Sequence, residues 1–327
     1  MRISSSLGMA AAVACMACVG LQTGAVQAQA YPTKPVRILI GYGAGGTTDT
    51  TARLIAPHLS EQLGRPFLVE NRPGATGTIA LEMVARAAPD GYTAIMIAGA
   101  DAVVPAVRSD LPYDLIRDFA PVALVVAAPF ILVVHPSVQA NDVMSLIAYA
   151  RANPGKLNYS SAGIGSSGHM VGELLNLRAK TAITHIPYKG TAAGAVAVVA
   201  GEVEISFPTG SAALPLMSAG KMKALAVTSA QRSVTMPTLP TMSEAGLPGF
   251  ERIGWYGLVA PAGTPRDIVN RLNTLIGEIV NKPEIKEQFF RQGLEGQRGT
   301  PEQYGELIRR EMAQNIELAK VVKLQPN

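Results

Sequence analysis

Cysteine is almost absent from the sequence: of 327 residues only Cys15 and Cys18 are cysteines, and both lie within the first 30. Charged residues make up 16% and aromatic residues 5% of the chain. A chain that lost its first 30 residues would have no thiol, which excludes disulfides and cysteine-bound metals. The 48% hydrophobic content excludes a largely disordered protein and provides for a large core.

Long hydrophobic runs are missing as well. The longest, Gly8–Leu21 and Val122–Val134, have 14 and 13 residues, whereas a membrane-spanning helix needs about 20. The charge is nearly balanced, because residues 31–327 contain 27 basic and 24 acidic residues. No stripe of lysine and arginine interleaved with aromatics is present, so we expect neither nucleic acid nor anionic lipid as a partner.

The first 30 residues have the pattern of an export signal. Arg2 is followed by an apolar stretch, and Ala28-Gln29-Ala30 precedes Tyr31-Pro32, which is typical of a cleavage site for secretion. We therefore expect residues 1–30 to be a signal peptide cleaved after Ala30. The alternative is a lipoprotein with Cys15 as its lipidated first residue.

Residues 36–98 alternate between apolar runs and helical periodicity. We expect strands at 36–40, 67–70 and 92–98 and helices at 48–63 and 78–88, with Gly64 ending the first helix. This alternation is typical of a doubly wound α/β sheet.

A second α/β series follows the apolar region Val122–Val134. We expect helices at 142–152, 169–179 and 193–200 and strands at 157–160, 183–186, 205–207, 224–228 and 253–259. Three helices complete the chain, the first (267–281) capped by Thr264, the second opened by Pro283 and the last capped by Thr300.

Two α/β halves joined by two apolar segments predict two lobes with a cleft between them. We expect residues 31–133 and 254–327 to form the first lobe and residues 134–253 the second. The expected hinge lies near Leu132–Val134 and Trp255–Leu258.

A first glycine-rich loop, residues 41–49, lies between a strand and a helix and contains no lysine or arginine. Its backbone N–H groups, at the positive end of the helix dipole, favour an anion of modest charge. The candidate ligand-binding residues are Tyr42, Gly45, Gly46, Thr47 and Asp49. Asp49 either favours the helix dipole or shapes the pocket.

The same loop admits two other interpretations. Gly41, Gly43 and Gly46 fit the dinucleotide pattern G-x-G-x-x-G, with Glu70 as a possible ribose ligand. An exported protein meets no dependable dinucleotide supply, so we expect no cofactor. A purely structural glycine turn is the third interpretation.

A second loop, residues 160–169, has the same composition and the same place between a strand and a helix. Two neutral cradles of N–H groups and hydroxyls in different lobes could hold one carboxylate from both sides. The candidates are Ser161, Gly165, Ser166, Ser167 and His169, with Tyr188, Gly190 and Thr191 from the next junction. Neither Ser166 nor Ser167 fits the hydrolase pattern G-x-S-x-G.

The four histidines, His58, His135, His169 and His185, are scattered without a ligand-spaced pair, so we expect no metal site. His169 is interpreted as a helix-start or packing residue rather than a base. Trp255 and Tyr256 are interpreted as core or hinge residues, with the alternative that one ring borders the ligand.

Seven short motifs follow one another along residues 31–327. They are Tyr31-Pro32-Thr33-Lys34-Pro35, Gly45-Gly46-Thr47-Thr48-Asp49, Glu70-Asn71-Arg72-Pro73-Gly74-Ala75, Gly163-Ile164-Gly165-Ser166-Ser167-Gly168-His169, His185-Ile186-Pro187-Tyr188-Lys189-Gly190, Glu244-Ala245-Gly246-Leu247-Pro248-Gly249 and Ala260-Pro261-Ala262-Gly263-Thr264-Pro265. In this order they resemble the Bug family of periplasmic solute receptors of tripartite tricarboxylate transporters, and the resemblance covers essentially all of residues 31–327.

The resemblance implies an α/β, two-lobed type II periplasmic-binding-protein fold with two doubly wound sheets that close on a small carboxylate. It also implies a periplasmic location and integral-membrane permease subunits as partners, and we expect a monomer. The chain departs from the family at Gly41-Tyr42-Gly43-Ala44, which is more flexible, and at Ala100 and Asp101, where small neutral residues are usual. Asp101 either faces solvent or receives a ligand amino group.

The leading hypothesis is therefore a non-enzymatic periplasmic receptor for an organic carboxylate. The rivals are an exported α/β enzyme, which the lack of a triad, metal cluster or cysteine nucleophile argues against, and a sensor subunit that presents the ligand to a membrane kinase. The ligand is an aliphatic acid of the citrate or succinate type or an aromatic acid of the phthalate or nicotinate type.

Overall fold

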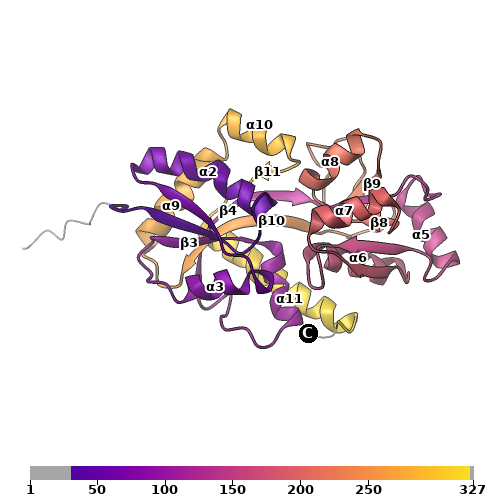
Figure 1. The fold of residues 1–327 in the computed structure, drawn as a ribbon, viewed down its shortest axis with the longest axis horizontal. Helices are drawn as coiled ribbons and strands as arrows, with labels where there is room; N and C mark the ends of the chain where they lie inside the picture. Colours follow the sequence, from indigo (N-terminus) through magenta and orange to yellow (C-terminus); the bar gives the residue numbers. More distant parts are fainter. Residues whose placement is uncertain (1–30, 325–327) are drawn as a thin grey trace, which may run out of the picture.

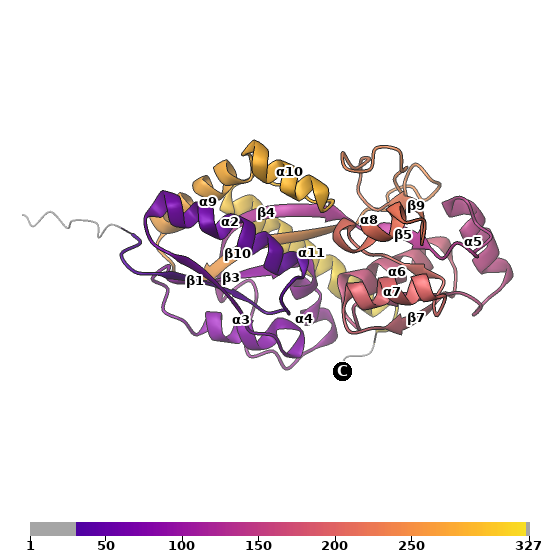
Figure 2. The same ribbon diagram turned by 45° about the horizontal axis from the view of Figure 1, so that its top comes forward.

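The computed structural model describes residues 31–324, so the expected signal segment and its cleavage site lie outside the described residues. The chain forms two sheets that lie side by side, each covered by helices on both faces (Figures 1 and 2). We call the part built on the six-stranded sheet the first lobe and the part built on the five-stranded sheet the second lobe. None of the helices within residues 31–324 has the length and apolar character that a bilayer crossing requires.

The first sheet has the strand order β11-β4-β10-β3-β1-β2. Its strands are β1 (Val36–Ile40), β2 (Phe67–Asn71), β3 (Thr93–Ala98), β4 (Phe119–Pro129), β10 (Ile253–Pro261) and β11 (Glu295–Gly296). The first three are parallel to one another, and β10 runs antiparallel between β3 and β4. This arrangement brings the carboxyl ends of β1, β2 and β3 to one edge of the lobe.

Both faces of the first sheet are buried, as a near-continuous apolar strand predicts. Ile38 and Ile40 point into the core under α2 (Thr47–Leu63), α9 (Arg266–Ile279) and α10 (Pro283–Arg291). Leu39 points into the opposite core under α3 (Thr78–Ala85) and α11 (Pro301–Val321). The two-residue period of a strand therefore explains why β1 carries almost no polar residue.

The second sheet has the order β7-β6-β8-β5-β9. Its strands are β5 (Ile131–Val134), β6 (Asn158–Ser161), β7 (Thr184–Pro187), β8 (Ile205–Ser206) and β9 (Lys223–Val227). The helices α5 (Val143–Ala152) and α6 (Ser167–Ala179) cover one face, and α7 (Thr191–Ala200) and α8 (Gly210–Ser218) cover the other. Strands β6, β7 and β8 are parallel, so their carboxyl ends also meet at one edge.

The chain passes between the sheets twice, once at Phe130 and once between β9 and β10. Thr228 joins the two passages: its Oγ1 accepts a hydrogen bond from the Phe130 N–H at 2.9 Å and donates to the Arg252 carbonyl oxygen at 2.6 Å. The first passage lies earlier than the expected boundary after residue 133, because Ile131–Val134 pairs with β8 and β9. The apolar run 122–134 conceals this change of sheet, since both strands in it are buried.

The expected end of α2 at Gly64 and the expected starts of α10 at Pro283 and of α11 after Thr300 are confirmed, whereas the start of α9 and the presence of α8 differ from the expectation. Gly64 ends α2 in the left-handed region, and the Thr300 hydroxyl accepts a hydrogen bond from Gln303 N–H at the start of α11. The prediction that Thr264 caps α9 is wrong, because its hydroxyl donates to the Pro261 carbonyl at 2.7 Å and Pro265 precedes the helix. Helix α8 was not predicted, and Pro215 lies inside it.

Candidate functional site

Among the helices within residues 31–324 that begin after the carboxyl ends of parallel strands are α2 after β1, α6 after β6, α7 after β7 and α8 after β8. Their N-cap residues are Gly46, Ser166, Gly190 and Thr209. The first N–H groups of a helix have no partner within it and attract negative charge. Of these four helix starts, one lies in the first lobe and three lie in the second.

The start of α2 in the first lobe lies against the start of α8 in the second lobe (Figure 1). The hydroxyls of Thr47 on α2 and Ser211 on α8 are 3.2 Å apart. A Cβ added to Gly165 would lie 2.9 Å from a methyl group of Val107, in α4 (Val104–Val107) of the first lobe. The structure therefore holds the two glycine-rich loops on opposite sides of one interface.

Residues of the segment after β2 and the end of β2 itself hold the first loop in place. The Asn71 side chain donates to the Tyr42 carbonyl at 3.2 Å and to Asp49 Oδ1 at 2.9 Å. A Cβ added to Gly41 would lie 2.7 Å from the Gly77 Cα, so no larger residue fits without a shift. The motif from Glu70 to Ala75 thus runs into a segment that supports the ligand loop from behind.

Asp49 shapes the first loop from inside. Its carboxylate accepts hydrogen bonds from the Gly45 N–H at 2.9 Å and from Arg53 Nε at 3.0 Å. Although burial raises it, hydrogen bonds from Arg53, Gly45 and Asn71 hold the pKa of Asp49 below its usual value. With its oxygens used in this way, Asp49 fits the pocket-shaping interpretation, and direct contact with a ligand stays a prediction.

Asp101 turns into the first lobe and not toward solvent. It lies in a short 3-10 helix, η2 (Gly99–Ala102), and is 1% exposed. Its Oδ1 accepts a hydrogen bond from the Tyr42 hydroxyl and its Oδ2 accepts one from the Ala98 N–H, both at 2.8 Å. The solvent-facing interpretation of Asp101 is therefore wrong, and the proposed contact with a ligand amino group has no support from this orientation, while neighbouring Ala100 is half-buried.

The second loop is tied down by its own histidine and serines. The Ser166 hydroxyl caps α6 by accepting from the His169 N–H at 3.3 Å, and the Gly165 N–H donates to His169 Nδ1 at 3.1 Å. Ser161 Oγ lies 2.6 Å from His185 Nε2 and accepts from the Gly163 N–H at 3.1 Å. His169 is a buried packing residue, as expected, and burial lowers its pKa to about 4.

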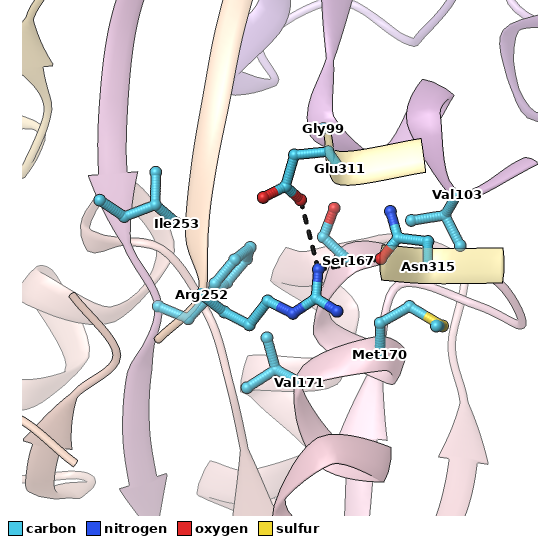
Figure 3. Close-up of a pocket in the computed structure, with 10 residues that line it drawn as sticks. Gly99, Val103, Ser167, Met170, Val171, Arg252, Ile253, Glu311 and Asn315 are labelled. Carbon is cyan, nitrogen blue, oxygen red and sulfur yellow. Dashed lines mark hydrogen bonds and ion pairs between the residues drawn. The ribbon is translucent and has the colours of Figure 1, made fainter. Parts of the chain in front are cut away.

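Ser167 lies beside the two passages between the lobes. It lines a cavity of about 10 Å³, together with Gly99, Phe130, Arg252, Glu311 and Asn315 among others (Figure 3). The Arg252 guanidinium donates to Asn315 Oδ1 at 2.9 Å and to Glu311 Oε2 at 3.3 Å. These contacts fasten the second passage between the lobes to α11.

The third predicted group consists of Tyr188, Gly190 and Thr191, and its side chains do not all point the same way. Gly190 precedes α7 with a φ of 108°, and Thr191, its first residue, is exposed. The Tyr188 hydroxyl instead lies 3.2 Å from Glu202, beyond the far end of α7. The Tyr188 hydroxyl is thus directed toward the end of α7, and contact of this junction with a ligand stays a prediction.

The sequence reasoning missed the start of α8. Burial raises the pKa of Tyr256, and hydrogen bonds with the side chains of Thr47 and Thr209 offset part of this effect. Tyr256 on β10 therefore lies between Thr47 of the first lobe and Thr209 of the second, and contact of its ring with a ligand stays a prediction. The signal was present: Thr209-Gly210-Ser211 follows a strand, as the other two hydroxyl-rich junctions do.

The geometry gives no support to the dinucleotide reading. Glu70, the candidate ribose ligand, is held by Arg37 through Nε and a terminal nitrogen at 2.8 and 2.9 Å. Among residues 31–324, no three histidine, cysteine, aspartate or glutamate side chains form a group suited to a metal ion.

Comparison with known proteins agrees with these features. A family model described as the tripartite tricarboxylate transporter family receptor matches residues 51–324. Protein BugT of Bordetella pertussis is 35% identical over 280 residues, which cover 85% of this chain and 86% of BugT.

Solved structures show the same fold. An R. palustris protein determined with adipate has a TM-score of 0.83 and 35% identity, covering 91% of this chain and all of that one. MatC from Rhodopseudomonas palustris with bound malate has a TM-score of 0.78 and 32% identity, covering 88% and 99%. The periplasmic binding protein BugD has a TM-score of 0.79 and 33% identity, covering 90% and 99%. The chain therefore belongs to the receptor family of the tripartite tricarboxylate transporters, which includes Bug proteins, and has their two-lobed fold.

Proposed function

We propose that this protein is a non-enzymatic periplasmic receptor that captures a small organic carboxylate between its lobes and delivers it to a tripartite tricarboxylate-type permease. The observation that carries the proposal is the meeting of α2 and α8, from different lobes, through the hydroxyls of Thr47 and Ser211. Each of these residues lies in the first turn of its helix, where unpaired N–H groups favour an anion.

Neutral donors carry the binding in this proposal. The two glycine-rich loops contain no lysine or arginine, and Arg53 near the first loop is engaged by Asp49. Hydrogen bonds from N–H groups gain strength when water is excluded, so a carboxylate is held well only when both lobes surround it. Closure of the lobes is thus part of the binding step.

Aliphatic dicarboxylates are the first ligand class to examine. The related structures with adipate and malate were determined with acids of this class. Several helix ends in the second lobe and one in the first suit a ligand with a carboxylate at each end. Aromatic carboxylates are the alternative class.

Membership of this family also supports a proposal for export and for the partner of the protein. We propose export with cleavage after Ala30, action as a monomer and delivery of the ligand to membrane-embedded permease subunits. A mature protein that begins at Tyr31 by N-terminal sequencing supports the first part, and one that begins at a lipidated Cys15 contradicts it.

A thermal-shift screen of aliphatic and aromatic carboxylates, followed by calorimetric titration, tests the proposal. At 100 times its dissociation constant, a ligand stabilises the folded protein by about 2.7 kcal/mol. Stoichiometric binding without loss of the compound supports a receptor. Consumption of the compound supports the rival exported enzyme. A cellular response to the ligand in a strain that lacks the permease supports the rival sensor subunit.

A further inference from the structure

A buried carboxyl group with no cation beside it lies behind the first glycine-rich loop. Asp101 is 1% exposed, and its two oxygens accept hydrogen bonds from the Tyr42 hydroxyl and the Ala98 N–H. Within the described residues, no basic side chain forms an ion pair with it. Tyr42 belongs to the loop itself, between Gly41 and Gly43, so a single hydrogen bond joins the carboxyl group to the candidate anion site.

The surroundings of Asp101 are polar but uncharged. The titratable groups that face it are Tyr42 from the first loop, Tyr113 from the segment before β4 and Tyr304 from α11. In each case burial and the charge of Asp101 raise the tyrosine pKa, so all three remain neutral at physiological pH. No group packed against Asp101 supplies a positive charge in compensation.

Two polar atoms close to this carboxyl group lack partners among residues 31–324. The Tyr304 hydroxyl and Trp255 Nε1 are buried without a hydrogen bond within the described structure, whereas the Tyr113 and Thr78 hydroxyls lie close enough to bond to each other. Thr78 follows Gly77, whose added Cβ would lie 3.0 Å from Asp101 Oδ1, and the Trp255 ring packs against Tyr304 and Gly99. A hydroxyl such as that of Tyr304 can rotate to donate or to accept, so it can accommodate either protonation state of the acid.

Burial disfavours the ionised acid and outweighs the hydrogen bonds from the Ala98 N–H and the Tyr42 hydroxyl, so the pKa of Asp101 is raised to about 7. A second negative charge brought to the adjoining loop disfavours the ionised form further, because like charges interact strongly in a site without water.

We propose that Asp101 takes up a proton when an anion binds at the first glycine-rich loop, so that ligand capture is coupled to protonation of this buried acid. The coupling rests on the proposed function, since it requires a carboxylate at that loop. By linkage, protonation of Asp101 strengthens anion binding, and affinity falls as the pH rises through 7 and above. A ligand is thus held more tightly on the acidic side of neutrality.

Proton uptake can be counted directly. We would titrate the protein purified from the periplasm with adipate and with malate at pH 7.5, in phosphate and in Tris, which have different ionisation enthalpies. The difference in observed enthalpy gives the number of protons taken up, expected at about half a proton per ligand. Both acids are fully ionised at this pH, so the ligand contributes none.

Two variants identify the group that takes up the proton. Asp101→Asn is expected to reduce the uptake to zero and to remove the decline of affinity above pH 7. Asp118→Asn alters another carboxyl group of the first lobe, which is paired with Arg117 and accepts a hydrogen bond from the Asp114 N–H, and is expected to keep the wild-type proton count.

Wild-type protein that binds adipate or malate with zero proton uptake overturns the coupling and leaves the receptor function intact. Uptake that persists in folded Asp101→Asn also overturns it. If neither these two acids nor any other carboxylate of the screen binds, the receptor proposal and the coupling both fail. The wild-type count alone decides the case if Asp101→Asn does not fold.

Discussion

The imidazole of His185 lies flat against that of His169, with ring centroids 3.8 Å apart and planes 15° from parallel. The two rings hold the second glycine-rich loop from behind, His185 through Ser161 Oγ and His169 through the Gly165 N–H. Burial lowers the pKa of His169 to about 4. Burial, together with repulsion from His169 when that ring is protonated, lowers the pKa of His185 to about 3. The loop is therefore supported by two neutral rings.

This stacked pair predicts a loss of stability in acid. In the unfolded chain both histidines bind protons below a pKa of about 6.5, while in the folded chain they do so only near 4 and 3. The unfolded state thus binds more protons in this window, and the free energy of unfolding falls by up to about 1.4 kcal/mol per pH unit for each histidine.

Denaturant unfolding measured between pH 7 and 4 checks this expectation. His185→Gln should reduce the slope, whereas His135→Gln, outside the stacked pair, should leave it unchanged. A wild-type stability that is flat between pH 6.5 and 4.5 would contradict the neutral pair.

Gly165 and Gly155 provide a matched pair of substitutions to alanine. Their φ angles are 73° and 74°, so alanine is strained equally at both, by about 1 kcal/mol. Only at Gly165 would the new Cβ meet Val107 of the other lobe, at 2.9 Å, while at Gly155 nothing lies within 4 Å. We expect Gly165→Ala to weaken ligand binding by more than tenfold and Gly155→Ala to leave the dissociation constant unchanged, by calorimetry. Equal dissociation constants for the two variants would show that Gly165 does not contact Val107 when the ligand is bound.

The hydroxyls of Thr47 and Ser211 should contribute jointly to binding. Removing one hydrogen bond costs about 0.5–1.5 kcal/mol, so Thr47→Val and Ser211→Ala should each weaken binding by that amount. Because each residue loses the same partner, the double variant should be less affected than the sum of the two. Strict additivity in a double-mutant cycle would show that the lobes do not meet through this pair when ligand is bound.

Arg252 should be far more important for stability than an exposed arginine with a similar partner. Its side chain is 10% exposed and that of Glu311 is 14% exposed, and removal of one member of a buried ion pair costs about 3 kcal/mol or more. Arg232 and Glu244 are 47% and 48% exposed, so Arg232→Gln should cost less than about 1 kcal/mol. Chemical denaturation of Arg252→Gln and Arg232→Gln gives both values, and comparable losses would mean that the hinge is not fastened by Arg252.

Much of the fold could be predicted because local patterns agree with the tertiary structure. The alternation of buried strands with helices at 36–98 and the Gly64 and Thr300 helix ends are examples. The place where the chain changes sheet could not be predicted, because β4 and β5 are equally apolar and only their pairing separates them. Helix α8 contains Pro215, which obscured its pattern, and its role depends on tertiary contact with Thr47.

The candidate site was predictable as a set of backbone loops but not as a set of side-chain contacts. Composition placed glycines and hydroxyls at strand-to-helix junctions, and the structure has helix starts there. The directions of Asp49, Asp101 and Tyr188 depend on partners distant in sequence or around a turn, such as Tyr42, 59 residues from Asp101. Burial of an acid without a cation cannot be inferred from its neighbours in the chain.

Small-angle scattering of the wild-type protein with and without a bound dicarboxylate, combined with thermal melts on the same samples, tests lobe closure most directly. Ligand that favours the closed form should raise the melting temperature and reduce the radius of gyration together, because in our proposal the free protein opens about the passages at Phe130 and Arg252. A melting temperature that rises while the radius of gyration keeps its ligand-free value would contradict capture by closure of the two lobes.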